Sequence, residues 1–139
     1  MSFSEAEVER YARHLVLREG AAMASSDYAM ITIEGTGGHG AMPQHAADPV
    51  VAAASLVMAL QTVVSRNVDP LHAAVVTVGA LQAGQANNVI PASARLELSV
   101  RALDSGVRAL LERRIRALAV AQAEGFGCRA QIDWRPGYA

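Results

Sequence analysis

The chain has 139 residues, of which 52% are hydrophobic, and its 12 basic and 13 acidic side chains leave a formal net charge of −1. This is the size and apolar content of one globular domain with one core. Because both signs of charge are interspersed, there is no concentrated cationic surface of the kind that nucleic-acid binding requires, and the sequence argues against that class of function.

The number of cysteines and the N-terminal sequence indicate the cellular compartment of the protein. Cys128 is the single cysteine, so no internal disulfide can form and a reducing compartment is expected. The first twenty residues carry acids where a signal peptide has a basic region, and they contain no continuous apolar run. The longest apolar stretch, Pro49 to Leu60, is shorter than the roughly 20 residues that span a bilayer. A soluble cytoplasmic protein is predicted.

In chain order, the first predicted element is an amphipathic helix over residues 4–18, which opens on a capping box from Ser4 to Glu7. A first strand is predicted over residues 28–34, where apolar side chains alternate with polar ones. A glycine-rich loop, residues 35–43, follows this strand.

A long helix is predicted over residues 48–66, because Asp48 can cap its free N–H groups and Pro49 suits the first helical position. Apolar residues fall on more than one face of this helix, and one sheet cannot cover them all. We therefore predict a second burial partner for it. One face carries Val50, Ala54, Val57, Gln61 and Val64, and the others carry Val51, Ala52, Met58, Leu60 and Val63.

The remaining elements complete an alternating plan. Strands are predicted over residues 72–82 and 94–101, separated by the turn-forming residues 84–88. A second helix begins after Asp104 or Ser105 and ends at Gly125, and a fourth strand covers residues 128–135. The helix carries Val107, Leu111, Ile115, Leu118 and Gln122 along one stripe.

The order strand, helix, strand, strand, helix, strand is that of the α+β ferredoxin-like fold. In this fold a four-stranded antiparallel sheet carries two helices on one face and leaves the other face open to water or to a partner. The N-terminal helix is additional to this plan.

The four histidines do not make a complete metal site from spacing alone. A catalytic zinc ion usually takes three convergent protein ligands, whereas His39 and His45 lie six residues apart with only Asp48 as a nearby acid. His14, His45 and His72 are interpreted as structural or surface histidines.

His39 differs because glycines occupy positions 37, 38 and 40. The glycines allow unusual φ angles and leave space around the imidazole, so the ring is either presented to another molecule or simply exposed where the strand ends. Asn88 is either a turn former or a ligand-binding amide. Arg101, on the polar face of its strand, is either solvated or a carboxylate binder. Spacing leaves these alternatives open.

Taken together, these segments resemble the lid domain of the M20 family of metallopeptidases and amidohydrolases. The resemblance covers about residues 22–139 and is greatest to hippurate hydrolases and other N-acyl amino acid amidohydrolases. It is carried by Met23–Tyr28, by the run ITIEGTGGHGAMPQHAADPVVAAASLVMALQTVVSR, by QANNVIP and by LELSVRALD.

The resemblance implies a domain that interrupts a larger catalytic domain, which holds two divalent metal ions, Zn or Mn, through His, Asp, Glu or Cys ligands. None of those ligand motifs occurs here, so the chain is expected to have no cofactor of its own and no activity alone. Family lids pair through strand edges and helices. This implies a homodimer through the 48–66 helix and an edge strand, in agreement with the surplus apolar faces of that helix.

The resemblance also implies roles for the three candidate site residues. His39 is implied to reach across the dimer and stabilise the oxyanion of the substrate carbonyl in the partner's active site. Asn88 and Arg101 are implied to hold the carboxylate or backbone of the substrate. A donor placed where negative charge develops contributes about 3–4 kcal/mol in such sites.

Residues 1–21 depart from the lid pattern. The segment from Ser4 to Glu19 resembles the first helix of adenylyltransferases of the ThiF and MoeB type but includes no nucleotide-binding loop. A chimaeric chain is therefore predicted, with its junction between Gly20 and Met23, a foreign segment 1–21 and a lid domain 22–139. Two alternatives are a small autonomous amidohydrolase using His39, His45 and Asp48, and a small-ligand-binding regulatory module of the same fold.

Overall fold

The computed structural model of the chain describes residues 4–6 and 24–138. Glu5 and Ala6 are helical. The rest of the helix predicted over residues 4–18, together with the predicted junction between Gly20 and Met23, lies outside the described residues.

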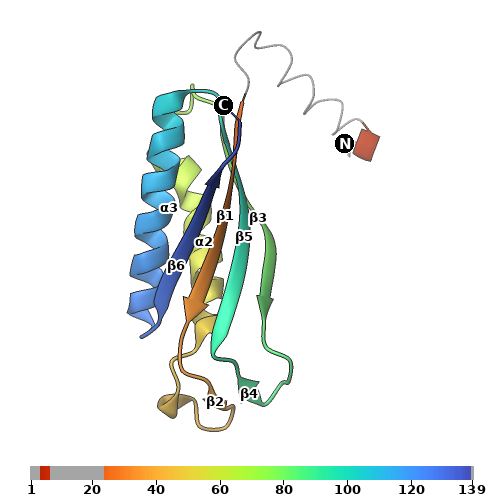
Figure 1. Cartoon of the computed structure of the whole chain (residues 1–139), viewed down its shortest axis with the longest axis vertical. Helices are drawn as coiled ribbons and strands as arrows, with labels where there is room; N and C mark the ends of the chain where they lie inside the picture. The colour runs from red at the N-terminus through yellow and green to blue at the C-terminus, as the bar shows by residue number, and fades with distance from the viewer. Residues whose placement is uncertain (1–3, 7–23, 139) are drawn as a thin grey trace.

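The described chain forms a two-layer α+β domain, shown in Figure 1. Its sheet contains β1 (Ser25–Glu34), β3 (Ala74–Ala83), β5 (Ser93–Ala102) and β6 (Arg129–Pro136), in the order β3-β5-β1-β6, and all neighbours are antiparallel. Helices α2 (Pro49–Asn67) and α3 (Ser105–Gly125) cover one face. The ferredoxin-like prediction is confirmed.

Strand β1 begins at Ser25, three residues before the predicted start at Tyr28. Serine and aspartate are poor strand formers, but here their side chains are bonded inside the fold. The Ser25 hydroxyl donates to the carbonyl oxygen of Ala102 over 3.1 Å, and Asp27 forms an ion pair with Arg108. Further along β1, Ala29, Ile31 and Ile33 enter the core as the alternation predicts.

Helix α2 starts as predicted, since the Asp48 carboxylate accepts a hydrogen bond from the Val50 amide over 2.9 Å. Its apolar residues lie on several faces, and the structure shows which of these faces enters the core. The stripe through Val50, Ala54, Val57, Gln61 and Val64 lies beside the core rather than in it, and Val50 is 41% exposed. The helix buries instead Ala52, Ala53, Leu56, Leu60 and Val63.

Helix α3 is capped by Asp104, whose carboxylate accepts from the Val107 amide over 2.9 Å. Its predicted stripe is confirmed at Val107, Leu111 and Ile115, which are buried, while Leu118 and Gln122 are half-buried. The helix ends at Gly125, but the left-handed turn that follows is made by Gly127, at φ 76°.

Strand β3 contains a β-bulge that alternation did not predict. Its pairing register with β5 shifts between Val78 and Ala80, so Gly79 is the extra residue. A glycine suits this position because it has no side chain to place on either face. Beyond the bulge, Leu81 lies opposite Leu96 and Gln82 lies opposite Arg95.

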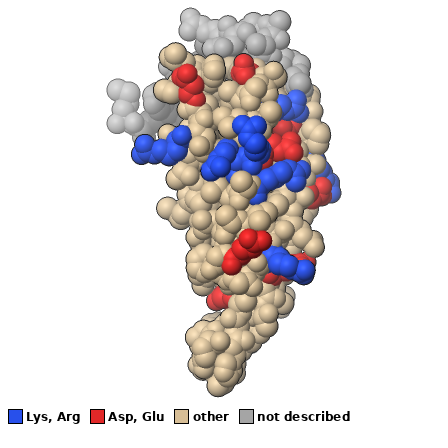
Figure 2. All heavy atoms as spheres, turned by 90° about the vertical axis from the view of Figure 1, so that its left-hand side faces the viewer, with Lys and Arg blue, Asp and Glu red and all other residues tan. Residues whose placement is uncertain are grey.

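The open face of the sheet is polar. Arg129 pairs with Glu34 over 3.1 Å and Arg135 pairs with Asp133 over 3.0 Å on this face. Further arginines of α3 and β6 gather with a few carboxylates on one side of the molecule (Figure 2).

Among the described helices, α2 alone is long and apolar enough to cross a membrane. Its residues Leu56, Leu60 and Val63 are fully buried in the domain core, as in an ordinary core helix.

Candidate functional site

The candidate site residues His39 and Asn88 lie together in a small two-stranded sheet that projects beyond the main sheet. Strand β2 (Gly38–His39) pairs with β4 (Val89–Ile90), and His39 lies opposite Val89. In Figure 1 this tip is at the end of the domain farthest from the C-terminus. The tip was not predicted as a sheet, because each strand has only two residues.

The glycines of the tip serve close packing rather than unusual backbone angles. Among the described residues, only Gly84 and Gly127 have positive φ, so the predicted role of φ freedom at positions 37, 38 and 40 is wrong. A Cβ added to Gly37 would lie 2.5 Å from the carbonyl oxygen of Ile90, and one added to Gly40 would lie 3.0 Å from the backbone of Asn88. These two glycines therefore allow the glycine-rich loop to lie directly against β4.

The imidazole of His39 is exposed, and its tautomer is set by a hydrogen bond. Its Nδ1 accepts from the amide of Ala41 over 3.0 Å. A neutral imidazole that accepts at Nδ1 carries its proton on Nε2. The ring therefore presents an N–H donor at its outer end.

Asn88 is fixed beside this loop through its backbone. Its carbonyl oxygen accepts from the Gly40 amide over 2.8 Å. Asn88 is an exposed residue. Neither Asn87 nor Asn88 has a positive φ angle. The amide of Asn88 is therefore available at the same end of the domain as the imidazole of His39.

Arg101 lies at the other end of the sheet. It sits near the end of β5, opposite Ser26 of β1 and Val75 of β3, on the exposed face. It is eight residue steps along β5 from Ser93, which corresponds to about 26 Å. Within one copy of the chain, Arg101 therefore does not meet His39 or Asn88.

The remaining predicted ligands are dispersed. His45 ends a short 3₁₀ helix (Pro43–His45), Asp48 caps α2, and His72 lies before β3. Across residues 4–6 and 24–138, no three His, Cys, Asp or Glu side chains are placed so that they could hold a metal ion. His14 lies outside the described residues. The described part of the chain does not fit a metal centre.

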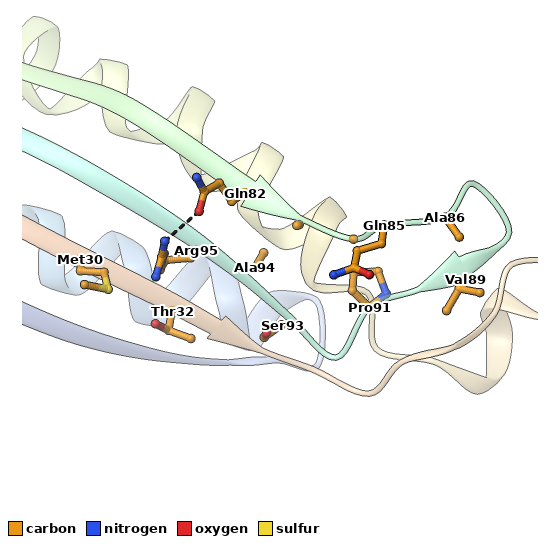
Figure 3. Close-up of a pocket in the computed structure, with 12 residues that line it drawn as sticks. Met30, Thr32, Gln82, Gln85, Ala86, Val89, Pro91, Ser93, Ala94 and Arg95 are labelled. Carbon is orange, nitrogen blue, oxygen red and sulfur yellow. Dashed lines mark hydrogen bonds between the residues drawn. The ribbon is translucent and has the colours of Figure 1, made fainter.

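A groove runs along the open face between the tip and the sheet, and Figure 3 shows its lining. Its volume is about 950 Å³. On its floor, Arg95 donates to the Gln82 side-chain oxygen over 2.8 Å. Arg95 and Arg101 lie on the same face of β5, because they are an even number of residues apart.

Sequence reasoning missed a buried ion pair at the opposite corner. Asp27 is 2% exposed and accepts from Nε of Arg108 over 2.9 Å and from the Gly137 amide over 3.1 Å. The hydrogen bonds from Arg108 lower the pKa of the Asp27 carboxyl, although burial opposes them. Asp27 follows two serines and precedes the predicted strand, so no sequence signal indicated that it is buried or that the distant Arg108 is its partner.

The chain matches a family model described as the peptidase dimerisation domain over residues 23–126. Hippurate hydrolase of Campylobacter jejuni is 51% identical over 117 residues, which are 84% of this chain and 30% of that protein. N-acetyldiaminopimelate deacetylase of Halalkalibacterium halodurans is 43% identical over 124 residues, 89% of this chain and 33% of that protein. The chain thus spans about a third of the length of these relatives.

Solved structures agree. A structure described as an aminohydrolase from methicillin-resistant Staphylococcus aureus has a TM-score of 0.80 and 32% identity, covering 83% of this chain and 30% of that one. A dinuclear metal-binding peptidase of the M20 family from Bacillus subtilis has a TM-score of 0.64 and 30% identity, covering 83% of this chain and 26% of that one. The chain belongs to the M20 family, and what it matches there is the peptidase dimerisation domain.

Proposed function

We propose that the chain is the dimerisation and lid domain of an M20-type amidohydrolase or peptidase. It holds two subunits together and lends substrate-binding side chains to an active site whose metal ions are bound by a separate catalytic domain. The family match over residues 23–126 and the coverage of about a third of each relative support this proposal.

The main support for the proposed dimer is the apolar side of α2 that faces away from α3. The Ser55 hydroxyl donates to the Gln122 side-chain oxygen of α3, so this side of α2 faces α3. Val57 follows two residues later, about 200° around the helix, and therefore faces away from α3. Val50, Ala54 and Val64 share this side, which lies over the β3 edge because α2 packs on β3 whereas α3 packs on β6.

The second half of the proposed interface is the free edge of β3. In the sheet order this strand pairs with β5 on one side and lies at the edge on the other. Its outer row of N–H and C=O groups is a template for another strand. We propose that β3 of one copy lies beside β3 of the next, with the two α2 helices packed together above the seam.

The distance between the site residues supports a shared active site. His39 and Arg101 of one copy are separated by most of the length of the sheet, so one small substrate cannot contact both. A substrate that uses both residues must take them from two copies. In the proposal, the Nε2–H of His39 donates to the substrate carbonyl oxygen in the partner's active site, while Asn88 and Arg101 bind the carboxylate or backbone of the substrate.

The proposal assigns no hydrolysis to the chain alone. The Bacillus subtilis neighbour is a dinuclear metal-binding peptidase, whereas the described part of this chain offers no cluster of metal ligands. Residues 1–21 are a segment foreign to the lid, and residues 22–139 are the lid domain. A family match that begins at residue 23 supports this division. The proposal places the protein in the cytoplasm, where the buried thiol of Cys128 remains reduced.

Light scattering on the eluting chain tests the dimer. At micromolar concentration we expect a mass of twice 14.6 kDa. A monomer under these conditions would contradict the proposal.

An activity assay separates the lid from the autonomous hydrolase. With N-acyl amino acids and added zinc or manganese, we expect no turnover, and the same result for His39→Ala. Turnover that His39→Ala abolishes would favour the autonomous enzyme. If the chain were monomeric and calorimetry showed saturable binding of an amino acid, the regulatory module would be favoured.

A further inference from the structure

We propose that Ser25, Ser26 and Asp27, with the groups that they bind, form a polar clasp at the start of β1. The clasp joins the segments that enter and leave the domain to α3 and to the strand that carries Arg101, so that this end of the domain moves as one unit. The inference rests on the proposed lid function only for its use, which is to hold the candidate substrate-binding arginine in a fixed position relative to those two segments.

Burial distinguishes these three residues from the rest of the described chain. Within residues 4–6 and 24–138, the buried polar or charged residues are Ser25, Ser26 and Asp27, at 5%, 0% and 2% exposure. Burying a polar group costs free energy unless the group is hydrogen-bonded. Three such residues in succession therefore point to a specific hydrogen-bonding role at the start of β1.

Ser25 binds the strand that carries Arg101. Its hydroxyl donates to the carbonyl oxygen of Ala102 over 3.1 Å and accepts from the Ala102 amide over 3.3 Å. A hydroxyl can donate and accept at the same time. Arg101 is the preceding residue of β5 and lies opposite Ser26 in the sheet register. The backbone next to Arg101 is thus held by a side chain in addition to the pairing of the strands.

The segment that leaves the domain is bound by Ser26 and Asp27. Pro136 has no N–H, and the pairing of β6 with β1 ends there, opposite Asp27. Beyond it, the Asp27 carboxylate accepts from the Gly137 amide over 3.1 Å. The Ser26 amide donates to the carbonyl oxygen of Tyr138 over 2.9 Å. In Figure 1 the segment that follows β6 accordingly lies beside the start of β1.

This segment passes so close to β1 that only glycine fits at position 137. A Cβ added to Gly137 would lie 1.9 Å from the carbonyl oxygen of Ser26, which is too close for any side chain. The φ angle of Gly137 is not positive, so the glycine is required by the space available and not by the backbone conformation. The two segments are therefore in direct backbone contact.

Arg108 completes the clasp from the helix layer. It donates to both carboxylate oxygens of Asp27, from Nε over 2.9 Å and from Nη2, and its Nη2 also donates to the carbonyl oxygen of Gly137 over 3.5 Å. A guanidinium matches a carboxylate in this forked geometry, whereas a lysine ammonium does not. Arg108 is the fourth residue of α3, where the helix macrodipole disfavours a positive charge. Its position is therefore explained by its partner Asp27 and not by the helix.

The clasp limits where a lid domain could bend. Arg101 and the segments that enter and leave the domain are held by the same three residues. A bend between the lid and a separate catalytic domain could therefore not lie within residues 25–138, and the Arg101 side chain would move together with both segments. His39 and Asn88 lie at the opposite end of the domain, beyond the reach of the clasp.

Amide hydrogen exchange, followed residue by residue with NMR, tests the clasp in the whole chain. The reporters are the amides of Ser26, Ala102 and Gly137, whose hydrogen bonds belong to the clasp. The amides of Thr36 and Gly40, which are hydrogen-bonded at the far end of the domain, report on the rest of the fold. We expect the three clasp amides to be protected in the wild type.

Gly137→Ala should separate the two segments, because its Cβ would collide with the carbonyl oxygen of Ser26. We expect exchange of the Ser26 amide to accelerate at least about tenfold, while the rates at Thr36 and Gly40 change by less than about twofold. Gly125→Ala is the matched control and should leave all these rates unchanged, since a Cβ at that position meets nothing within 4 Å.

Arg108→Lys tests the ion pair while keeping a positive charge beside Asp27, so that the buried carboxylate does not lose its counter-charge. We expect exchange of the Gly137 amide, which shares the Asp27 carboxylate, to accelerate at least about tenfold. Arg113→Lys makes the same change at an exposed arginine of α3 and should have no effect.

Ser25→Ala tests the connection to the Arg101 strand. Without the hydroxyl, we expect exchange of the Ala102 amide to accelerate at least about threefold, while that of the Gly137 amide stays unchanged. An unchanged rate at Ala102 would remove β5 from the clasp.

The outcomes separate this inference from the function on which its use rests. The clasp is overturned if the Ser26 and Gly137 amides of the wild type exchange as fast as unprotected amides. It is also overturned if Gly137→Ala accelerates Thr36 and Gly40 as much as Ser26, because the glycine would then stabilise the whole domain. If the clasp amides respond as expected in a chain that light scattering finds monomeric, the clasp stands and the proposed dimer is contradicted.

Discussion

At the scale of single residues, the chemistry of His39 is set by the backbone around it. The amide of Ala41 binds Nδ1, which leaves the proton on Nε2 and makes the exposed end of the ring a donor. Because the loop that carries His39 lies directly against β4, the direction of this donor depends on Gly37 and Gly40 having no side chains. The glycines therefore act on His39 through packing.

A pair of alanine variants tests this dependence. We expect Gly37→Ala to separate β2 from β4, because the new Cβ would lie 2.5 Å from the carbonyl oxygen of Ile90. Hydrogen exchange of the Gly40 amide, which bonds to Asn88, should accelerate at least about tenfold, equivalent to about 1.4 kcal/mol. Gly38→Ala is the control, since its Cβ would meet nothing closer than 3.7 Å. Equal exchange in the two variants would refute the packing role.

The buried Asp27 makes a second prediction, on pH. Arg108 lowers the pKa of Asp27 in the folded chain, so the ion pair stabilises the fold above the ordinary carboxyl pKa, about 4. This contribution is lost as the pH falls through the lower folded-state pKa. We expect Asp27→Asn to reduce the free energy of unfolding by about 2–3 kcal/mol at pH 7, measured by urea denaturation.

The difference between wild type and Asp27→Asn should shrink as the pH is lowered below about 4, because the wild-type carboxyl then becomes neutral as well. Asp133→Asn is the matched control. Asp133 pairs with Arg135 on the surface, so its replacement should cost no more than about 1 kcal/mol. A difference for Asp27→Asn that stays constant with pH would show that its charge is not what stabilises the fold.

At the scale of elements, both helices begin on an aspartate. Asp48 and Asp104 each accept a backbone N–H over 2.9 Å at the first turn. We expect Asp48→Ala and Asp104→Ala each to cost about 1 kcal/mol in the free energy of unfolding, while Asp48→Ser retains most of the stability. Thermal or urea unfolding measures these changes, and an unchanged midpoint for either alanine variant would contradict the capping role.

Local patterns predicted every element of the main sheet and both covering helices, because alternation and capping act over a few residues. They did not predict the start of β1 at Ser25, whose side chain bonds to Ala102 seventy-seven residues away. They also did not indicate which apolar face of α2 enters the core. An all-round apolar helix does not reveal which face meets the sheet, because that is decided by the crossing of α2 over β3 and β5.

The candidate site was only partly predictable for a related reason. The glycines around His39 and the asparagines at 87 and 88 pointed to two loops, but only pairing between β2 and β4 joins them. The separation of Arg101 from both is also a property of the register of the sheet. Since that register is set by contacts distant in sequence, spacing alone gave no distance between these residues.

At the scale of the whole molecule, the domain is unequal at its two sheet edges. The β6 side carries α3, where Arg116 lies over the Trp134 ring at 5.9 Å and charged groups face water. The β3 side carries the exposed apolar stripe of α2, with Met58 71% exposed nearby. An exposed apolar helix face next to a strand with unpaired backbone N–H and C=O groups favours association of the monomer with other chains. In the proposed dimer, the second copy would cover the apolar face of α2 and pair with the free edge of β3.

The stability of the chain should therefore depend on its concentration. A dimer gains stability by mass action, and each tenfold dilution removes about 1.4 kcal/mol per mole of dimer. We expect the thermal midpoint of the wild type to fall on dilution. That of Val57→Asp should be lower and independent of concentration, because the charged carboxylate would be buried between the two α2 helices of the proposed dimer.

Val120→Asp provides the control for an added charge. Val120 is 40% exposed on α3. It lies two residues before Gln122, whose side chain bonds to Ser55 of α2, and is therefore about 200° around the helix from it and faces away from α2. This variant should keep the concentration dependence of the wild type. If the wild-type midpoint did not move over a hundredfold dilution through the micromolar range, the exposed side of α2 would not be a dimer interface. If Val120→Asp lost the dependence as fully as Val57→Asp, the interface would not be confined to the side of α2 that faces the β3 edge.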